Sequence, residues 1–196
     1  MNFMKKTYNP KTIAVVGSQR RIGTTTQAIQ MVEYLQLMGY KACYVEMNST
    51  RFISKAAELY LDLEGKAAGS FKLDNIMMYS SEKIQEILKL DYDFLVKDYG
   101  SYENVDFERL SFLEQKQKIL VCGAKADEIY QSCEALKDDE LGLDGFIFSF
   151  VSKEDRDEVK EMMEEKKELT YFADYVPAPF SYLSTANYIY KGLLGV

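Results

Sequence analysis

The chain has 196 residues, a formal net charge of −7, 47% hydrophobic residues and no histidine. This length fits a single domain over residues 1–196 that buries a proper core. The acidic balance argues against a generic nucleic-acid binder, and the missing histidine excludes Ser-His-Asp, Cys-His and histidine–metal chemistry.

The sequence shows no membrane or secretion signal. No apolar run is long enough to span a bilayer, and residues 1–11 lack the apolar stretch of a signal peptide. The cysteines Cys43, Cys122 and Cys133 show no metal-ligand spacing. We therefore expect a cytoplasmic protein with reduced cysteines, two of them inside predicted strands.

The first predicted unit is a strand, a loop and a helix, with the sequence TIAVVGSQRRIGTTT from Thr12 to Thr26. The apolar strand ends at Gly17, and a polar, basic loop follows it. Apolar residues at helical spacing then run through residues 23–38, and Gly39 is a typical helix stop. Such a unit directs backbone N–H groups and the positive end of the helix dipole towards an anion.

The rest of the chain alternates between strands and helices. Strands are predicted at residues 41–47, 71–79, 92–99, 118–122, 146–151 and 171–176. Helices are predicted at residues 50–63, 84–88, 105–115, 126–137, 154–167 and 183–194. This alternation indicates an α/β fold, a mostly parallel sheet with helices on both faces.

A parallel sheet gathers its functional residues at one edge. Ligand crevices lie at the carboxyl ends of the strands. Five segments fall at those ends: residues 17–26, 46–48, 98–101, 149–153 and 176–180. We therefore expect these segments to converge.

These segments resemble the ParA/MinD family of deviant Walker A ATPases, including its pilus-assembly TadZ/CpaE-like branch. The resemblance rests on the loop SQRRIGTTT and its helix, on YDFLVKDYGS, which looks like a Walker B strand, and on KILVCGAK, GFIFSFVSK and YFADYVPAP. It covers nearly the whole chain. It implies a P-loop NTPase-like three-layer sandwich and a site for ATP or ADP, with or without Mg²⁺.

The loop departs from the family's pattern, GKGGxGKTT, at both lysines. Gly23 and Thr25 match, but Gln19 stands at the signature lysine and Thr24 at the Walker lysine. The resemblance makes Thr25 the magnesium-binding hydroxyl and Asp98 the Walker B carboxylate. The nucleotide-binding residues that it implies are Gln19, Arg20, Arg21, Ile22, Gly23, Thr24, Thr25, Thr26, Ser149 and Pro177.

Arg20 and Arg21 replace two glycines of the pattern. A guanidinium binds phosphate bidentately, so either arginine is a candidate to replace the lysine. The alternative is that both point into solvent, and each arginine loses the close backbone approach that glycine allows. Position in the sequence does not choose between them.

Two carboxylates are weak catalytic candidates. Asp98 with Thr25 would hold Mg²⁺ directly or through water, or it caps the turn after its strand. Glu46 orients water as a base or is a solvated residue at the end of a strand. Without a lysine beside it, we favour the second interpretation for Glu46.

The missing lysine affects binding and catalysis unequally. One charge-assisted hydrogen bond contributes about 1.5–3 kcal/mol, so its loss weakens binding roughly ten- to a hundredfold. A cation on the transition state contributes about 10³–10⁵ in the rate of phosphoryl transfer. Nucleotide binding can survive this loss, but efficient hydrolysis is not expected.

The sequence therefore predicts a ParA/MinD-like nucleotide-binding protein or pseudo-ATPase that serves as a localisation, partitioning or assembly scaffold. We expect a protein partner or a homodimer. Two alternatives stay open: an active ATPase that uses Arg20 or Arg21, and a small-molecule phosphotransferase. A chain that binds no cofactor is a further alternative.

Overall fold

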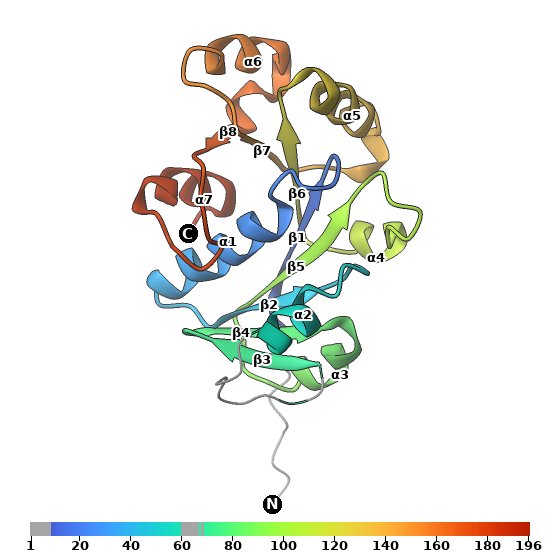
Figure 1. Cartoon of the computed structure of the whole chain (residues 1–196), viewed down its shortest axis with the longest axis vertical. Helices are drawn as coiled ribbons and strands as arrows, with labels where there is room; N and C mark the ends of the chain where they lie inside the picture. The colour runs from blue at the N-terminus through green and yellow to red at the C-terminus, as the bar shows by residue number, and fades with distance from the viewer. Residues whose placement is uncertain (1–8, 60–66, 68) are drawn as a thin grey trace, which may run out of the picture.

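The computed structural model describes residues 9–59, 67 and 69–196, and these contain one eight-stranded sheet of order β3-β4-β2-β5-β1-β6-β7-β8. The strands are β1 (Lys11–Gly17), β2 (Ala42–Glu46), β3 (Ser70–Leu73), β4 (Ile76–Ser80), β5 (Phe94–Ser101), β6 (Gln117–Gly123), β7 (Gly145–Ser149) and β8 (Thr170–Ala173). Neighbouring strands are parallel except for β3, which pairs antiparallel with β4. In Figure 1 the sheet runs from β8 near the top to β3 near the bottom.

Helices cover both faces of this sheet. They are α1 (Thr24–Leu37), α2 (Phe52–Leu59), α3 (Ile84–Ile87), α4 (Arg109–Leu113), α5 (Ala126–Leu136), α6 (Arg156–Met162) and α7 (Asn187–Leu194). Helices α1, α2 and α7 share one buried cluster, whereas α4, α5 and α6 pack in a second cluster and α3 in a third. Figure 1 shows α1 and α7 on one side of the strands and α3, α4 and α5 on the other. The predicted α/β fold is confirmed.

The central strands are buried on both faces, which explains their continuous apolar sequences. In β1, Ile13 and Val15 face α1, while Ala14 and Val16 face the opposite cluster. Cys43 and Cys122 lie buried in β2 and β6, as predicted, and all three cysteines are free.

Helix α1 is joined to the C-terminal part of the chain as well as to the sheet. Tyr190 Oη donates to Gln27 Oε1 at 2.8 Å, and Tyr34 Oη donates to the Val196 carbonyl at 2.6 Å. Gln30 Nε2 donates to the Pro179 carbonyl at 2.7 Å. The segment after β8 is therefore held against the middle of α1.

The predicted strand at residues 71–79 is a hairpin. It divides into β3 and β4, which are joined at Asp74 and Asn75. Asp74 adopts a positive φ of 51°, a conformation that aspartate tolerates in a two-residue hairpin turn. Only β3 is an edge strand, because β4 also pairs with β2.

Three predicted helices differ from the structure. The region 105–115 is helical only in α4, and Phe107 before it packs against aromatic rings instead. The region 154–167 divides into α6 and a 3₁₀ segment (Glu164–Leu169), where Glu164 has a positive φ of 48°. Helix α2 covers part of the predicted 50–63, and residues 60–63 lie outside the described residues. None of the described helices is long and apolar enough to cross a membrane.

One carboxyl group on α1 makes stability depend on pH. Burial, with a smaller contribution from the nearby Asp74 charge, raises the pKa of Glu33 from 4.5 to about 7. The folded chain therefore holds a proton on Glu33 that the unfolded chain releases between these values. As a result, the contribution of Glu33 to the free energy of unfolding falls as pH rises from 4.5 to about 7 and stays constant at higher pH.

We expect Glu33→Gln to remove this part of the pH dependence. Urea unfolding of both proteins at several pH values from about 4 to about 8 gives the difference in stability as a function of pH. The wild type should lose stability relative to the variant as pH rises. Parallel curves across the window would contradict the raised pKa.

Candidate functional site

The site begins where β1 ends, in the centre of the sheet between β5 and β6. Gly17 has no space for a side chain: a Cβ there would lie 2.2 Å from Thr24 Oγ1 and 2.7 Å from Ile22 Cγ2. The Ile22 side chain is buried in the core and anchors the loop. Gly23, with a φ of 97°, then leads into α1.

The N-terminus of α1 offers free donors. Its first helical hydrogen bond runs from the Gln27 N–H to the Gly23 carbonyl at 2.9 Å, and no side chain of the described residues caps this helix end. The N–H groups of the first turn, at Thr24, Thr25 and Thr26, therefore precede the helical ladder. Together with the helix dipole they suit an anion.

A cleft of about 630 Å³ lies in front of this turn. Its lining is Gln19, Arg20, Arg21, Gly23, Thr24, Thr25, Thr26, Ser49, Thr50, Lys55, Gly100, Ser101, Asn104 and Phe150. The charged residues in this lining are Arg20, Arg21 and Lys55, all cationic, in a chain of net charge −7. This local reversal of sign favours an anionic ligand.

The predicted strand ends converge only in part. Segments 17–26, 98–101 and 149–153 contribute to the lining, whereas residues 46–48 are not part of it and the following Ser49 and Thr50 are. Segment 176–180 does not reach the cleft, because β8 is three strands away from β1 and Pro179 is bound to α1. Pro177 is exposed on that segment and is not part of the cleft lining, and its contact with a nucleotide stays a prediction.

Asp98 and Thr25 meet as predicted. Thr25 Oγ1 donates to Asp98 Oδ2 at 2.7 Å, and Tyr44 Oη donates to the same oxygen at 2.7 Å. The Gly100 N–H donates to Asp98 Oδ1 at 2.9 Å. Burial raises the pKa of Asp98, and these three hydrogen bonds oppose that rise.

This pair fits Mg²⁺ through Thr25 more readily than through Asp98. The Thr25 hydroxyl gives its proton to Asp98 and keeps its lone pairs for a cation. Asp98 already accepts three hydrogen bonds, two of them on one oxygen. Among the described residues no group of three or more Cys, Asp or Glu side chains is placed to hold a metal ion. Any cation here would therefore depend on ligand oxygens and water.

Glu46 has a structural role that differs from the expected solvated one. It is 5% exposed, and its carboxylate accepts hydrogen bonds from the Phe52 and Ile53 N–H groups and from Thr50 Oγ1. Glu46 therefore caps the N-terminus of α2, and its oxygens are engaged there rather than with water in the cleft.

The structure distinguishes the two arginines. Arg20 Nε donates to Asn104 Oδ1 at 2.9 Å, and the Arg20 N–H donates to Glu103 Oε1 at 3.0 Å. Arg21 is exposed, has a positive φ of 63°, and within the described chain its guanidinium has no hydrogen-bond partner. Arg21 therefore keeps all its guanidinium donors for a ligand, whereas Arg20 has its Nε–H engaged by Asn104 and keeps its two Nη groups.

Three buried hydroxyls at this edge of the sheet lack a hydrogen-bond partner among the described residues: Ser80 Oγ, Ser101 Oγ and Ser149 Oγ. Ser101 lines the cleft, and Ser149 Oγ lies 3.5 Å from the position that a Cβ on Gly23 would take. A buried hydroxyl without a partner costs free energy unless a ligand or water satisfies it. Ser101 and Ser149 are therefore placed to hydrogen-bond a polar ligand or water near the loop.

Sequence reasoning missed Ser49, Thr50, Lys55 and Asn104, and it placed Ser101 and Phe150 at this edge only as parts of segments 98–101 and 149–153. A lysine on a helix normally belongs to a solvated face, so nothing in the sequence indicated that Lys55 lies at the site. Phe150 was assigned to a strand, but β7 ends at Ser149 and Phe150 has a positive φ of 62°. Such a conformation at a strand end is a tertiary property that composition does not reveal.

No protein-family model matches the chain, and no curated protein sequence matches it significantly. Solved structures do match. A plasmid partition protein from Borrelia burgdorferi bound to AMPPNP has a TM-score of 0.66 and 14% identity, over 95% of this chain and 97% of that one. A chain of the MinC:MinD cell division complex from Aquifex aeolicus has a TM-score of 0.63 and 12% identity, over 93% and 86%.

A nucleotide-binding protein from Archaeoglobus fulgidus in complex with ADP has a TM-score of 0.55 and 11% identity, over 94% of this chain and 87% of that one. The chain thus has the fold of MinD/ParA-type P-loop ATPases at low sequence identity. At such identity the comparison establishes the fold and leaves the chemistry to the residues of this chain.

We expect Tyr44→Phe to lower the free energy of unfolding by about 1.5–3 kcal/mol, because the buried Asp98 carboxylate loses a charge-assisted hydrogen bond. Urea unfolding near neutral pH measures the change. Tyr79→Phe is the matched control: its hydroxyl is paired with the neutral Tyr92 hydroxyl, so it should cost less. Equal effects of the two substitutions would show that the hydrogen bond from Tyr44 to Asp98 contributes no more to the free energy of unfolding than the one between Tyr79 and Tyr92.

Proposed function

We propose that this protein binds ATP or ADP in the cleft in front of α1, hydrolyses it slowly or not at all, and acts as a localisation, partitioning or assembly scaffold. One observation carries the proposal. The uncapped first turn of α1 opens into a cleft with cationic side chains and the Thr25–Asp98 pair, yet its loop has no lysine.

The residues present fit a nucleotide's phosphates. Free N–H groups at the start of α1 would bind phosphate oxygens, and Arg21 would add a charged contact. Mg²⁺ bound at the Thr25 hydroxyl would neutralise phosphate charge. The exposed Phe150 ring lines the same cleft and pairs with Tyr175 at 6.2 Å between ring centroids, so it offers an apolar surface to the rest of the ligand.

The scaffold role rests on what the loop lacks. Thr24 stands where a lysine would bind the terminal phosphate, and Gln19 is uncharged. The loss of one charge-assisted contact leaves binding feasible, but phosphoryl transfer loses a cation that contributes about 10³–10⁵ in rate. A partner protein is part of the proposal, and one fold relative was solved as a MinC:MinD complex.

An ATPase that uses Arg21 is the second candidate. The supporting observation is that Arg21 lines the cleft without a partner in the described chain, whereas Arg20 is bound to Asn104. Because a guanidinium can stabilise a transferring phosphoryl group, the two candidates differ in turnover rather than in binding.

Titration calorimetry with ATP and with ADP, each with Mg²⁺ and with EDTA, tests the proposal. We expect measurable binding of both nucleotides and only a modest effect of Mg²⁺, because Asp98 is already engaged by its neighbours. Phosphate release should stay near background. Absence of binding by either nucleotide would overturn the proposal, and steady turnover abolished by Arg21→Ala would favour the second candidate.

The variant Thr24→Lys serves as a gain-of-function arm of the same experiment. It should tighten ATP binding roughly ten- to a hundredfold, because it restores a charge-assisted contact of about 1.5–3 kcal/mol. The cation next to the helix dipole costs only about 0.3–1 kcal/mol of helix stability. Circular dichroism checks that the fold is retained.

We further expect the oligomeric state to be independent of ATP. Gln19 cannot neutralise the phosphates of a facing subunit, and facing pairs of Arg20 and Arg21 would repel each other. Multi-angle light scattering across an ATP titration should give one constant mass. An ATP-driven shift from monomer to dimer would contradict the scaffold interpretation and favour a working nucleotide switch.

A further inference from the structure

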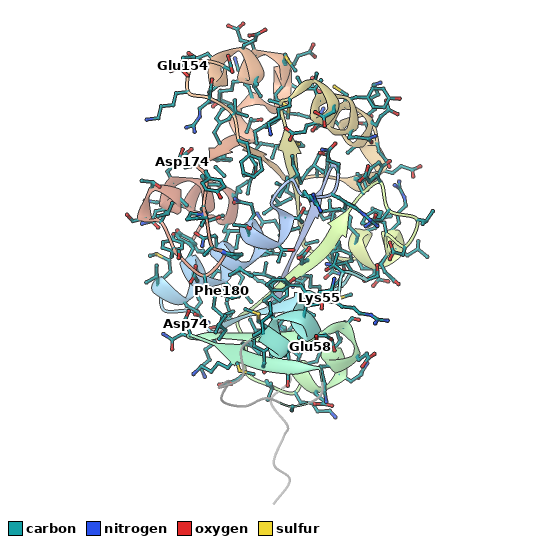
Figure 2. All side chains as sticks on the ribbon, in the orientation of Figure 1. Lys55, Glu58, Asp74, Glu154, Asp174 and Phe180 are labelled. Carbon is teal, nitrogen blue, oxygen red and sulfur yellow. The ribbon has the colours of Figure 1, made fainter. Side chains whose placement is uncertain are left out.

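Lys55 is placed at the cleft by α2 rather than by the loop. It is the fourth residue of α2, it is exposed, and it lines the cleft together with Thr24 and Thr25. Figure 2 labels Lys55 on the ribbon of α2. A lysine thus reaches the cleft from a different element than the sequence pattern would suggest.

Lys55 lies near the N-terminus of α2, where the Glu46 carboxylate caps the Phe52 and Ile53 N–H groups. Among the described residues, Lys55 Nζ donates one hydrogen bond, to the Thr50 carbonyl at 2.8 Å. An ammonium group has three donors, so two remain for other oxygens as far as the described residues go.

The start of α2, which carries Lys55, is held in place by hydrogen bonds to Glu46. Glu46 at the end of β2 caps α2 through the Phe52 and Ile53 N–H groups, and it also accepts a hydrogen bond from Thr50 Oγ1. Glu46 is the register neighbour of Asp98 in the sheet. The turn that holds Lys55 is therefore fixed to the strand pair that carries Asp98.

A buried hydroxyl in the same cleft lining is a second group that could bind a ligand. Ser101 is 2% exposed, and its Oγ has no hydrogen-bond partner among the described residues. It follows Asp98 on β5 and lines the cleft with Lys55. A ligand oxygen between these groups would satisfy the buried hydroxyl and offset the lysine charge.

We propose that Lys55 binds the terminal phosphates of the nucleotide and replaces, from α2, the lysine that the loop has lost. This inference rests on the proposed nucleotide binding and names the residue that supplies its cation. Lys55 is a binding residue in this role, and Glu46 is a positioning residue that acts through the cap of α2.

The test is calorimetric titration of the wild type and of Lys55→Ala, Lys55→Arg and Lys89→Ala with ATP, ADP and AMP. Lys55→Ala should weaken ATP binding about ten- to a hundredfold. It should change AMP binding by less than about threefold, because AMP lacks the terminal phosphates and a distant exposed charge contributes little. Lys55→Arg keeps the charge and should recover part of the loss.

Lys89→Ala is the matched control. Lys89 is an exposed lysine just before β5, at the amino ends of the parallel strands and therefore at the sheet edge opposite the cleft. Its loss removes the same net charge and should leave all three affinities unchanged. Thermal unfolding of the ligand-free proteins adds a second readout: Lys55→Ala should unfold at nearly the same temperature as the wild type, because it loses only one exposed hydrogen bond.

The outcomes separate the two proposals. If the wild type binds none of the nucleotides, the proposed function fails, and this inference fails with it. If the wild type binds ATP and Lys55→Ala binds it equally well, only the role of Lys55 is overturned. Equal losses for ATP and AMP, or a lower unfolding temperature for Lys55→Ala, would assign Lys55 a structural role instead.

Discussion

The arrangement of the molecule depends on one buried carboxylate. Asp98 lies in the middle of the sheet, between Val15 of β1 and Glu46 of β2. A buried charge is tolerated only when hydrogen bonds compensate for lost hydration, and Asp98 obtains them from Thr25 of α1, Tyr44 of β2 and the Gly100 N–H. These contacts join helix α1 to strands β2 and β5 beside the cleft.

Most of the fold could be predicted from the sequence because its signals are local and repeated. Buried strands appear as short apolar runs, and the glycines at positions 17 and 39 mark element ends. The hairpin at residues 70–80 was missed because Met77 and Met78 continue the apolar run past its turn. Residues 105–108 were misassigned because aromatic packing of Phe107 replaces helix formation there.

The parts of the site that come from one continuous strand–loop–helix unit could be predicted from the sequence. The parts that depend on the position of another element could not. The loop and the Thr25–Asp98 pair follow from a strand–loop–helix unit next to a strand that ends in a carboxylate. The capping role of Glu46 and the reach of Lys55 depend on where α2 sits, which no pattern in the sequence specifies. Pro177 failed to reach the cleft because contacts with α1 hold its segment elsewhere.

The hydrogen bonds between α1 and the C-terminal segment connect the cleft with a distant part of the surface. Helix α1 has 14 residues and extends about 21 Å, with the cleft at its first turn and the bond from Tyr34 to Val196 along its length. Tyr190 and Val196 are therefore bonded to the same helix whose first turn faces the cleft.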